Sequence, residues 1–310
     1  MSVLARLSVV LMLAALVAQG SQGAVHVDDA GRSVELSRPA QRVITLAPNL
    51  TEFVFAVGAG DALVGTMDTS NFPAAAQRIP RIGDYQRLDV ERILALKPDL
   101  VLVWYHGNQG RELAQLEAAG LRLFYLEPRT LDDVARSLAL IGSLVGRSAE
   151  GEARAAALRR EAEALKLRYV QAEPVSVFFQ VWSRPLMTLN DGHLTSDLIA
   201  LCGGRNVFGS LSALAPQISL ESVVAADPEV ILGTRELDAA QPLWRREPER
   251  PGFEIWRPFA RMTAVRQRWI YTMPGDLVTR QGPRVIDGAR ALCGALDEVR
   301  AERRSLGPRR

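Results

Sequence analysis

The side chains that could hold a metal ion or carry out catalysis are few in this chain of 310 residues. Histidine occurs three times, as His26, His106 and His193. A zinc site usually takes at least three protein ligands, and these histidines lie far apart in the sequence, so we do not expect a preformed metal site. One of them, or Tyr85, could still supply an axial bond to a metal that a macrocycle already holds.

Sequence motifs of common catalytic sites are also absent. The chain has no GxSxG elbow, no Walker loop and no GxGxxG segment after a predicted strand. Residues 201–206 (LCGGRN) contain adjacent glycines, but they follow a predicted helix and are typical of a helix end. No pair of carboxylates and no Cys/His arrangement stands out. We therefore expect a protein that is not an enzyme.

The chain contains two cysteines, Cys202 and Cys293. They lack the CxxC spacing and the neighbouring histidines of a zinc or thioredoxin-like site. In an exported protein an isolated pair of cysteines usually forms one disulfide, which is the expectation for this pair.

Aromatic side chains are the group best suited to bind a ligand. Trp104 and Trp182 lie at the ends of predicted strands, and Tyr85 lies just before a predicted helix. In open parallel sheets, ligands bind beyond the carboxyl ends of the strands. An apolar ring with a polar group suits a large, flat, amphipathic ligand better than an amino acid or an inorganic ion. Each tryptophan, taken alone, could instead belong to the core.

Two glutamates occupy matching positions in an internal repeat. Residues 89–102 read DVERILALKPDLVL, and residues 219–232, at an offset of 130, read SLESVVAADPEVIL. Each copy predicts a short capped helix followed by a buried strand. Glu91 and Glu221 then lie in the first turn on the outward face, where the helix dipole stabilises a carboxylate. They could be ordinary surface residues, or a matched pair that docks onto a two-fold partner such as a dimeric membrane channel.

Apolar segments of strand length alternate with helical segments along the chain. In the first half we expect strands at 42–46, 63–66, 99–104 and 121–126, and helices at 111–119 and 131–145. In the second half we expect strands at 175–182, 229–233 and 269–273, and helices at 195–201 and 285–302. Asn49 is expected to cap one further helix, with Glu52 as its capping-box partner. Strands that are apolar almost throughout and alternate with helices indicate an α/β fold with mainly parallel sheets, flanked by helices on both faces.

A long helix is predicted at the middle of the chain. Residues 148–172 lack proline and are rich in Ala, Leu, Arg and Glu, so a rigid helix of about 35 Å could join two lobes. The predicted organisation is a signal peptide at 1–23, an N-terminal α/β lobe at 24–147, this backbone helix at 148–172, a C-terminal α/β lobe at 173–302 and a disordered basic tail at 303–310.

The N-terminus has the pattern of a secretory signal peptide. Arg6 precedes an apolar stretch at 7–18, and small residues follow, with cleavage expected after Gly20 or Gly23. The stretch is too short to span a bilayer comfortably, so we expect a cleaved leader and a soluble, exported protein. Without Arg6 the chain keeps 36 basic residues (37 − 1) and 35 acidic residues, and this balance argues against a nucleic-acid partner.

Several segments together resemble a known family. They are residues 42–65 (RVITLAPNLTEFVFAVGAGDALVG), 81–104 (RIGDYQRLDVERILALKPDLVLVW) and 216–232 (PQISLESVVAADPEVIL). Through them, nearly the whole mature chain resembles the helical-backbone receptors for metal complexes, and within that family its vitamin B12-binding members most of all. Other members bind haem or ferric siderophores. The resemblance implies two α/β lobes on one long helix with little hinge motion, no enzymatic activity, and delivery of a ligand from the periplasm to a two-fold ABC permease with its ATPase.

The resemblance also implies roles for single residues. Glu91 and Glu221 match the two glutamates that meet arginines of the permease, and Trp104 matches a tryptophan of the ligand cleft. Tyr85 stands where the vitamin B12-binding members have a tryptophan. The segments LCGGRNVF and ARALC match the disulfide-bearing segments of the family, which implies that the two cysteines are joined.

Three positions depart from the family pattern. Thr69 replaces a cleft tyrosine, while Ala215 and Leu277 each replace a tryptophan, so the expected cleft is less aromatic. Trp182 is a weaker candidate for ligand contact. We expect a monomer that binds a corrinoid such as cobalamin, with haem or a ferric siderophore as the alternative and no permanently bound cofactor. A basic cluster in the cleft would favour the siderophore, because those complexes are commonly anionic.

Overall fold

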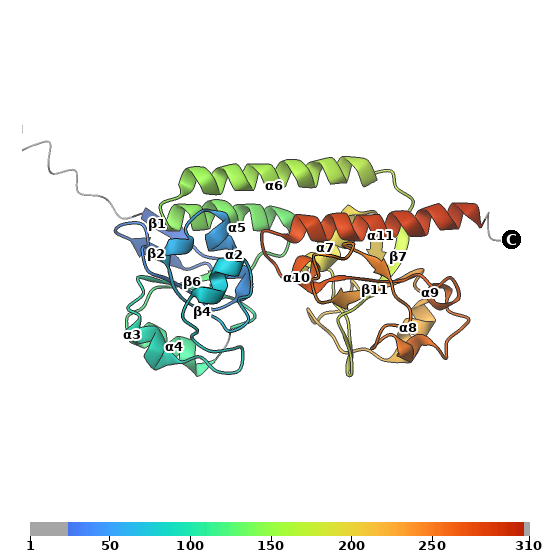
Figure 1. Cartoon of the computed structure of the whole chain (residues 1–310), viewed down its shortest axis with the longest axis horizontal. Helices are drawn as coiled ribbons and strands as arrows, with labels where there is room; N and C mark the ends of the chain where they lie inside the picture. Colours follow the sequence, from blue (N-terminus) through green and yellow to red (C-terminus); the bar gives the residue numbers. More distant parts are fainter. Residues whose placement is uncertain (1–23, 109, 307–310) are drawn as a thin grey trace, which may run out of the picture.

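The N-terminal lobe is built on a parallel sheet. The structure is a computed structural model that describes residues 24–108 and 110–306. In Figure 1 two α/β lobes lie side by side below a layer of long helices. The sheet of the N-terminal lobe has the order β4-β3-β5-β6 and consists of β3 (Val43–Thr45), β4 (Leu63–Thr66), β5 (Leu100–Trp104) and β6 (Leu123–Leu126). Its helices are α2 (Pro48–Ala56), α3 (Val90–Ala95), α4 (Arg111–Ala118) and α5 (Leu131–Leu144), with 3-10 turns η1 (Gly60–Ala62) and η2 (Ala74–Arg78).

Helices cover both faces of this sheet. Successive side chains of a strand point to opposite faces. Leu100 and Leu102 of β5 accordingly pack in one apolar cluster with α2 and α5, and Val101 and Val103 pack in another with α3 and α4. The prediction of an α/β fold with buried parallel strands is confirmed, because a strand buried on both faces must be apolar almost throughout.

The C-terminal lobe repeats this arrangement with one added edge strand. Its sheet has the order β10-β7-β11-β13-β12, in which only the pairing of β12 with β13 is antiparallel. The strands are β7 (Val175–Gln180), β10 (Gly204–Asn206), β11 (Val230–Arg235), β12 (Arg245–Arg246) and β13 (Ile270–Pro274). The helices are α7 (Leu194–Leu201), α8 (Leu220–Ala226), α9 (Thr263–Arg266), α10 (Gly275–Val278) and α11 (Val285–Ser305), with a 3-10 turn η3 (Glu254–Trp256).

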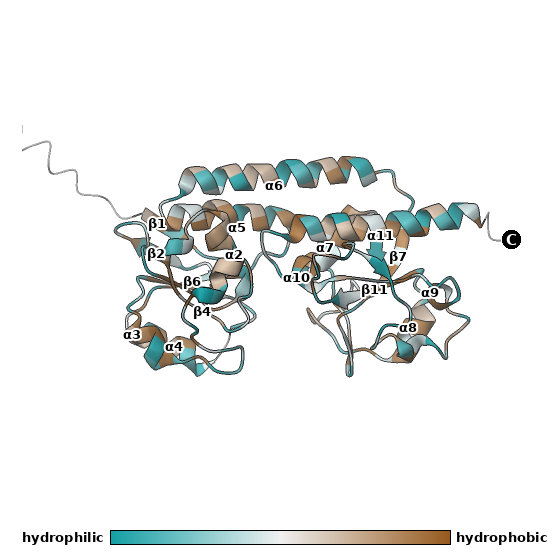
Figure 2. Cartoon of the chain, viewed as in Figure 1, coloured by the Kyte–Doolittle hydropathy of each residue, from teal (hydrophilic) through white to brown (hydrophobic). Residues whose placement is uncertain are grey.

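The long helix α6 (Ser148–Tyr169) connects the two lobes. It contains 22 residues, is about 33 Å long and runs along the top of both lobes in Figure 1. Figure 2 shows polar residues along its whole length. On its inner side, Gly151 lies against α5, where an added Cβ would come within 2.7 Å of the Leu138 carbonyl oxygen. The helix ends three residues before the predicted end at 172, and Pro174 shortly afterwards disfavours a helical conformation at the residue before it.

The apolar core is continuous between the lobes on the side of α6. One cluster of buried side chains extends from α2 and α5 through Ala155 and Leu158 of α6 to α7 and α11. Polar contacts add to it, since Arg159 of α6 pairs with Asp132 of α5 at 2.7 Å. Tyr169 Oη, at the end of α6, donates to Asp297 Oδ2 of α11 at 2.7 Å. The lobes are therefore joined by packing along the backbone helix as well as by the chain itself.

The predicted disulfide is present. Cys202, just after α7, is bonded to Cys293 of α11, across a sequence separation of 91 residues. Nearby, the buried side chain of Arg300 donates to the Cys202 carbonyl oxygen at 2.5 Å and to the Glu173 carbonyl oxygen at 2.9 Å. These bonds fix α11 against the start of the C-terminal lobe.

The expectation of a disordered tail from residue 303 is wrong for its first residues. Helix α11 continues to Ser305, because Arg303 is held by contacts that the sequence did not indicate. Its guanidinium pairs with Glu173 at 2.7 Å and with Glu229 at 3.0 Å, and it donates to the Pro174 carbonyl oxygen at 3.0 Å. Residues 307–310 and the predicted signal peptide at 1–23 lie outside the described residues.

The capping box predicted at the start of α2 is also wrong. The helix begins at Pro48, with Ala47 in the N-cap position and no side-chain cap. Proline suits the first turn because its missing N–H would have had no partner inside the helix. Asn49 and Glu52 are buried within α2, and their side chains bond to the other lobe instead.

Two short hairpins were not predicted, and Trp182, expected at the end of the strand at 175–182, belongs to the second of them because β7 ends at Gln180. Strands β1 (Ala24–Val27) and β2 (Ser33–Leu36) pair in antiparallel fashion, and their turn docks beside β6 through the Asp29 N–H, which donates to the Tyr125 carbonyl oxygen at 2.9 Å. Strands β8 (Trp182–Ser183) and β9 (Leu186–Met187) form the second hairpin. Every helix among the described residues is too short or too polar to cross a bilayer.

Candidate ligand-binding site

Four charged side chains join the lobes near the carboxyl ends of β3 and β13. We call Glu52, Asp276, Arg280 and Arg284 the junction cluster. Glu52 of α2 pairs with Arg280 at 2.9 Å and with Arg284 at 2.6 Å, and Arg280 also pairs with Asp276 at 2.9 Å. The Glu52 side chain is 2% exposed and both arginine side chains are 14% exposed. Two guanidinium groups thus meet two carboxylates, and the cluster carries no net charge.

Neutral side chains extend the junction cluster on both lobes. Asn71 Oδ1 accepts from Arg280 at 2.8 Å, and Asn49 Nδ2 donates to the Gln281 carbonyl oxygen at 3.2 Å. The Arg284 guanidinium stacks 3.9 Å from the centre of the exposed Phe72 ring. This stacking leaves an aromatic edge at the surface where the lobes meet.

A second contact between the lobes lies beside the start of α5. The backbone N–H of Leu131, the first residue of α5, donates to Asp197 Oδ2 of α7 at 2.9 Å. Burial raises the pKa of the Asp197 carboxyl, although the hydrogen bond from Leu131 opposes that shift. The lobes are therefore bridged near the end of β3 by the junction cluster and at the start of α5, after β6, by the hydrogen bond from Leu131 to Asp197. The strand β5, which ends at Trp104, lies between β3 and β6 in the sheet.

Trp104 lies at the end of β5, as predicted, and its indole is partly buried. Its ring packs against the main apolar cluster, and Gly107 lies so close to the ring that an added Cβ would be 1.8 Å from a ring carbon. The indole Nε1 is buried and has no hydrogen-bond partner among the described residues. The loop after β5 therefore folds back over part of the Trp104 ring.

The other predicted aromatic residues are at the surface. Tyr85 is 79% exposed, and it lines a small hollow of about 20 Å³ together with Gly107, the residue that covers Trp104. Trp182 is 61% exposed in the β8–β9 hairpin, and its Nε1 donates to the Arg184 carbonyl oxygen at 2.9 Å. Tyr85 is thus brought near Trp104, whereas Trp182 belongs to the opposite lobe.

The positions that replace family aromatics differ in accessibility. Thr69 and Ala215 are exposed. Leu277 is buried within α10, where its backbone packs against Gly288 of α11. This burial distinguishes Leu277 from the exposed Thr69 and Ala215.

Sequence reasoning missed Phe72 and the arginines of the junction cluster. The signals were present in part: Phe72 precedes a proline just after the β4 strand, and Asp276, Arg280 and Arg284 follow one another at a spacing of four residues after β13. Nothing in that spacing indicated Glu52 as their partner, because Glu52 belongs to the other lobe.

The three histidines do not form a site. His193 is buried at the N-cap of α7, where its Nδ1 accepts from the Thr195 N–H at 3.1 Å, and burial lowers its pKa to about 4. His26 lies on β1, and burial lowers its pKa as well. His106 follows β5 near Glu127. Within the part of the chain that the structure describes, no three His, Cys, Asp or Glu residues are grouped so as to hold a metal ion.

The repeat helices have the predicted form. Asp89 Oδ1 caps α3 by accepting from the Arg92 N–H at 2.9 Å, and Ser219 Oγ caps α8 by accepting from the Ser222 N–H at 3.2 Å. Each helix leads into a buried strand, β5 or β11. Glu91 and Glu221 are both exposed, and Figure 1 shows that α3 and α8 lie at the edge of the molecule opposite α6.

The electrostatic setting of these two glutamates can be read from their neighbours. The pKa of Glu221 is lowered by its own backbone N–H and by the Ser219 hydroxyl, as expected for a carboxylate at a helix start. Beside Glu91, a hollow of about 680 Å³ is lined by more acidic than basic residues: Asp68, Asp84, Asp89 and Glu112 against Arg87 and Arg111. The outward edge around α3 is therefore acidic.

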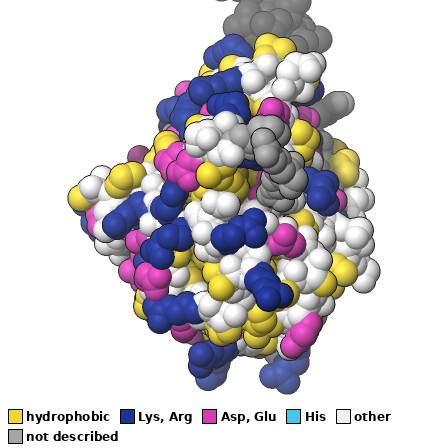
Figure 3. All heavy atoms as spheres, turned by 90° about the vertical axis from the view of Figure 1, so that its right-hand side faces the viewer, with side chains coloured by type: hydrophobic (Ala, Val, Ile, Leu, Met, Phe, Trp, Pro, Cys, Tyr) yellow, Lys and Arg dark blue, Asp and Glu magenta, His cyan; other side chains and the backbone are white. Residues whose placement is uncertain are grey.

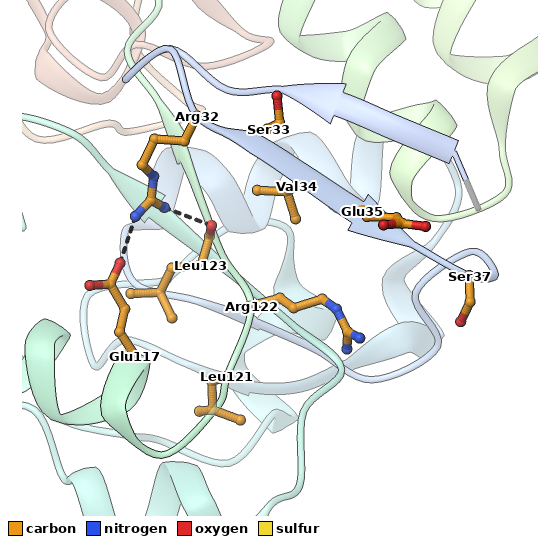
Figure 4. A pocket seen from close by; sticks show the side chains of 9 residues that line it. All are labelled: Arg32, Ser33, Val34, Glu35, Ser37, Glu117, Leu121, Arg122 and Leu123. Atoms are coloured by element: carbon orange, nitrogen blue, oxygen red, sulfur yellow. Dashed lines mark hydrogen bonds and ion pairs between the residues drawn. The ribbon is translucent and has the colours of Figure 1, made fainter.

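Another hollow lies away from the carboxyl ends of the strands. Figure 4 shows it between β2 and the end of α4, where Arg32 reaches across to Glu117 and to the Leu123 carbonyl oxygen. Its volume is about 500 Å³. Leu121 and Leu123 place it at the amino end of β6, opposite the edge at which parallel sheets bind ligands.

The end of the C-terminal lobe carries many arginines, but acidic residues lie among them. Glu249, for example, pairs with Arg257 at 2.5 Å and with Arg268 at 3.5 Å. Figure 3 shows Lys and Arg side chains interspersed with Asp and Glu over this face. The described residues of this face form no continuous basic stripe of the kind that a nucleic-acid interface has.

The sequence matches the family model described as periplasmic binding protein over residues 43–277, most of the chain. The chain belongs to the periplasmic binding protein family. The family is one of binding proteins, which confirms the expectation that the chain is not an enzyme. A relative named vitamin B12-binding protein, from Vibrio cholerae, is 32% identical to this periplasmic binding protein over 255 residues, which cover 82% of this chain and 88% of the relative.

Solved structures agree with this assignment. The periplasmic vitamin B12-binding protein BtuF of Vibrio cholerae superimposes on this periplasmic binding protein with a TM-score of 0.76 and 31% identity, covering 84% of this chain and 98% of BtuF. The periplasmic haem-binding protein RhuT from Roseiflexus sp. RS-1 superimposes with a TM-score of 0.71 and 25% identity, covering 84% and 99% of the two chains. Both the lead ligand class and its alternative are therefore represented among the relatives.

Proposed function

We propose that this protein captures a corrinoid such as cobalamin between its lobes and delivers it to a two-fold ABC importer. The observation that carries the proposal is the 32% identity with the vitamin B12-binding protein of Vibrio cholerae over 82% of the chain. We also propose that the leader at 1–23 is cleaved on export and that the mature protein acts as a monomer in the periplasm. Cobalamin is then a transported ligand and not a permanently bound cofactor.

The charge of the junction cluster supports a corrinoid over a ferric siderophore. Arg280 and Arg284 are half-buried cations at the lobe junction, and Glu52 and Asp276 compensate both. An anionic siderophore would have to compete with those carboxylates for the guanidinium groups. A corrinoid presents amide groups at its rim, and these require hydrogen bonds and no excess of positive charge.

The joined lobes also suit a large rigid ligand. The continuous core along α6 and the junction cluster both hold the lobes at one separation. A ligand that is itself rigid then loses little conformational freedom when it binds to a site that is already formed. Exposed Tyr85, Trp182 and Phe72 can supply apolar contact area, and small Thr69 and Ala215 leave room beside them.

The ligand is tested by calorimetry with cyanocobalamin. Replacing an aromatic anchor with alanine often costs about 2 kcal/mol, about thirtyfold in affinity, so Tyr85→Ala and Trp104→Ala should each weaken binding by that order. Trp182→Ala should have a smaller effect. Trp244→Ala is the matched control, because Trp244 packs against Gly294 of α11 and its Nε1 donates to Glu298 at 2.7 Å. Wild-type protein that binds haem or a ferric siderophore but not cyanocobalamin at tens of micromolar would replace the corrinoid with that alternative.

Glu91 and Glu221 are the proposed docking residues. Their exposure, their equivalent positions in capped helices and the common edge of α3 and α8 support contact with two equivalent basic sites on a two-fold permease. Leaving one partner of an interfacial charge pair unpaired costs about 2–5 kcal/mol when the pair is buried. The double variant Glu91→Ala/Glu221→Ala should therefore keep its affinity for cobalamin but lose uptake through the importer.

The matched control for docking is Glu150→Ala/Glu163→Ala, which removes two exposed glutamates of α6, at the opposite edge of the molecule. This control should retain both binding and uptake. If the Glu91/Glu221 double variant lost cobalamin affinity and kept docking, the assignment of these glutamates would be wrong.

A further inference from the structure

Four buried hydroxyl groups lie together at the carboxyl edge of the N-terminal sheet. They belong to Thr45 and Thr66, the last residues of β3 and β4, to Thr51 of α2 and to Ser70 of the loop after β4. All four residues are fully buried, and we call them the hydroxyl cluster. The cluster ties two strands, one helix and one loop together at the edge where parallel sheets bind ligands.

The distances between the four oxygens allow a closed cycle of hydrogen bonds. Thr66 Oγ1 donates to Ser70 Oγ at 2.7 Å, and Ser70 Oγ lies 3.0 Å from Thr51 Oγ1. Thr45 Oγ1 lies 2.7 Å from Thr51 Oγ1 and 3.0 Å from Thr66 Oγ1, and the latter two oxygens are 2.6 Å apart. A hydroxyl has one proton and can also accept, so each group can donate once and accept once within the cluster. Loss of one hydroxyl would leave buried neighbours without a partner.

The residues that directly follow Thr51 and Ser70 reach across to the other lobe. Glu52 pairs with both guanidinium groups of the junction cluster, and Asn71 Oδ1 accepts from one of them, that of Arg280, at 2.8 Å. In both places one residue is held inside the N-terminal lobe while its neighbour contacts the C-terminal lobe. Consecutive Cα atoms are only about 3.8 Å apart, so a displacement within the hydroxyl cluster is passed on to the contacts between the lobes.

The loop that carries Ser70 is held at further points. The Arg81 guanidinium donates to the Met67 carbonyl oxygen at 2.7 Å and to the Ser70 carbonyl oxygen at 3.1 Å. Two residues after Ser70, the exposed Phe72 ring stacks on the Arg284 guanidinium. The loop is therefore fixed to the N-terminal lobe by its backbone and by one hydroxyl, and it contacts the C-terminal lobe with its last side chains.

We infer that the hydroxyl cluster positions the junction cluster, so that Thr51 and Ser70 raise the affinity for the ligand by fixing the separation of the lobes. The effect on the ligand rests on the proposed function. A ligand that contacts both lobes binds more tightly when they are already at the right separation, because ordering them on binding would cost free energy. Both residues are fully buried, so they act through Glu52 and Asn71 and are positioning residues.

The first test removes one hydroxyl and keeps the shape of the side chain. Thr51→Val lacks the hydroxyl, whereas Thr51→Ser keeps it and lacks only a methyl group. In calorimetry with cyanocobalamin, Thr51→Val should bind about tenfold more weakly, which corresponds to one lost buried hydrogen bond, and Thr51→Ser should stay within about threefold of wild type. The matched control is Thr263→Val, which removes a buried hydroxyl that donates to Asp227 Oδ2 at 2.9 Å. Thr263 lies on α9, at the end of the C-terminal lobe away from the N-terminal lobe in Figure 1, so this variant should keep its affinity.

The second test measures the positioning directly and needs no ligand. Spin labels attached through Ala118→Cys and Ala226→Cys report from exposed sites on α4 and α8, one in each lobe. Double electron–electron resonance should give a narrow distribution of distances between the labels in the otherwise wild-type protein. Adding Thr51→Val should broaden or shift this distribution, whereas Thr51→Ser and Thr263→Val should leave it unchanged. A purely local structural role would lower stability without moving the distribution.

The outcomes separate the positioning role from the proposed function. If wild-type protein binds cyanocobalamin and folded Thr51→Val changes neither measurement, or only one of them, the inference is wrong and the corrinoid function stands. If Thr51→Val does not fold, Ser70→Ala, which removes the hydroxyl of the loop, takes its place in both measurements. If folded wild-type protein binds no cyanocobalamin, the proposed function falls with the effect on the ligand, while the distance distribution still decides whether the hydroxyl cluster positions the lobes.

Discussion

Replacing Glu52 with glutamine should destabilise the protein more than the loss of any surface ion pair. The substitution keeps the size of the side chain but removes the charge that faces Arg280 at 2.9 Å and Arg284 at 2.6 Å. The two guanidinium groups would then share Asp276, which lies 2.9 Å from Arg280 but 3.8 Å from Arg284. With Glu52 2% exposed and the arginines 14% exposed, water cannot replace the lost partner.

The expected size of this effect follows from burial. Breaking a buried ion pair by removing one partner typically costs about 3–5 kcal/mol, because the remaining charge is left uncompensated. The comparison is Glu117→Gln, which removes the partner of Arg32 at 2.6 Å where the two side chains are 44% and 39% exposed. An exposed pair contributes about 0–1 kcal/mol, so Glu117→Gln should change little.

The assay is urea unfolding at neutral pH, with the free energy of unfolding taken from the midpoint and slope of each transition. The reasoning about the junction cluster is refuted if Glu52→Gln loses less than about 1 kcal/mol, the value of a surface pair. A second variant checks the cause: Glu52→Gln/Arg284→Met should be more stable than Glu52→Gln alone, because it removes the charge that the first change left uncompensated.

Further predictions concern the disulfide, a buried histidine and the backbone helix. The double variant Cys202→Ala/Cys293→Ala should lose up to about 4–5 kcal/mol of stability, since the bond closes a loop across 91 residues. A thiol titration of the unfolded, unreduced wild-type protein should find no free thiol. His193 has its pKa lowered by burial from 6.5 to about 4, so below pH 6.5 the unfolded chain binds a proton that the folded protein does not. Stability should therefore fall by about 2 kcal/mol from pH 7 to pH 5 on account of this group, and equilibrium unfolding of His193→Asn, which keeps a capping oxygen, should lack that component. Tyr169 links α6 to α11, and burial and the hydrogen bond to Asp297 raise its pKa to about 12. Thermal unfolding of Tyr169→Phe should therefore show a loss of about 1 kcal/mol in the free energy of unfolding. No loss would show that the hydrogen bond to Asp297 is not stabilising.

Much of the fold follows from local sequence patterns. The strand β5 is apolar throughout, and β3 and β11 begin with consecutive apolar residues, which is typical of strands covered by helices on both sides. The helix from Ser148 is built from strong helix formers, so its existence needs no tertiary contact to explain it. Short strands such as β1 and β12 were missed because they are stabilised by pairing with neighbours and not by their own composition.

The candidate site could be predicted only in outline. The rule that ligands bind at the carboxyl ends of parallel strands predicted that Trp104 and Tyr85 lie at one edge of the sheet, and the structure places the two residues near each other there. It could not show that Gly107 would cover the Trp104 ring, because a loop conformation depends on contacts across the whole lobe. It also could not distinguish exposed Ala215 from buried Leu277, since both stood at positions chosen by resemblance and not by burial.

The sequence by itself determined the local properties of this protein: the apolar strands, the long helix, the capped repeat helices that carry Glu91 and Glu221, and the pair of cysteines. These depend on residues close together in the chain, so composition and spacing are enough to specify them. Tertiary structure alone decided which distant groups meet. Glu52 became the partner of Arg280 and Arg284 instead of a helix cap, and Glu127 came to lie behind His106, because charge and hydrogen-bonding needs are satisfied across space by side chains that no sequence interval links.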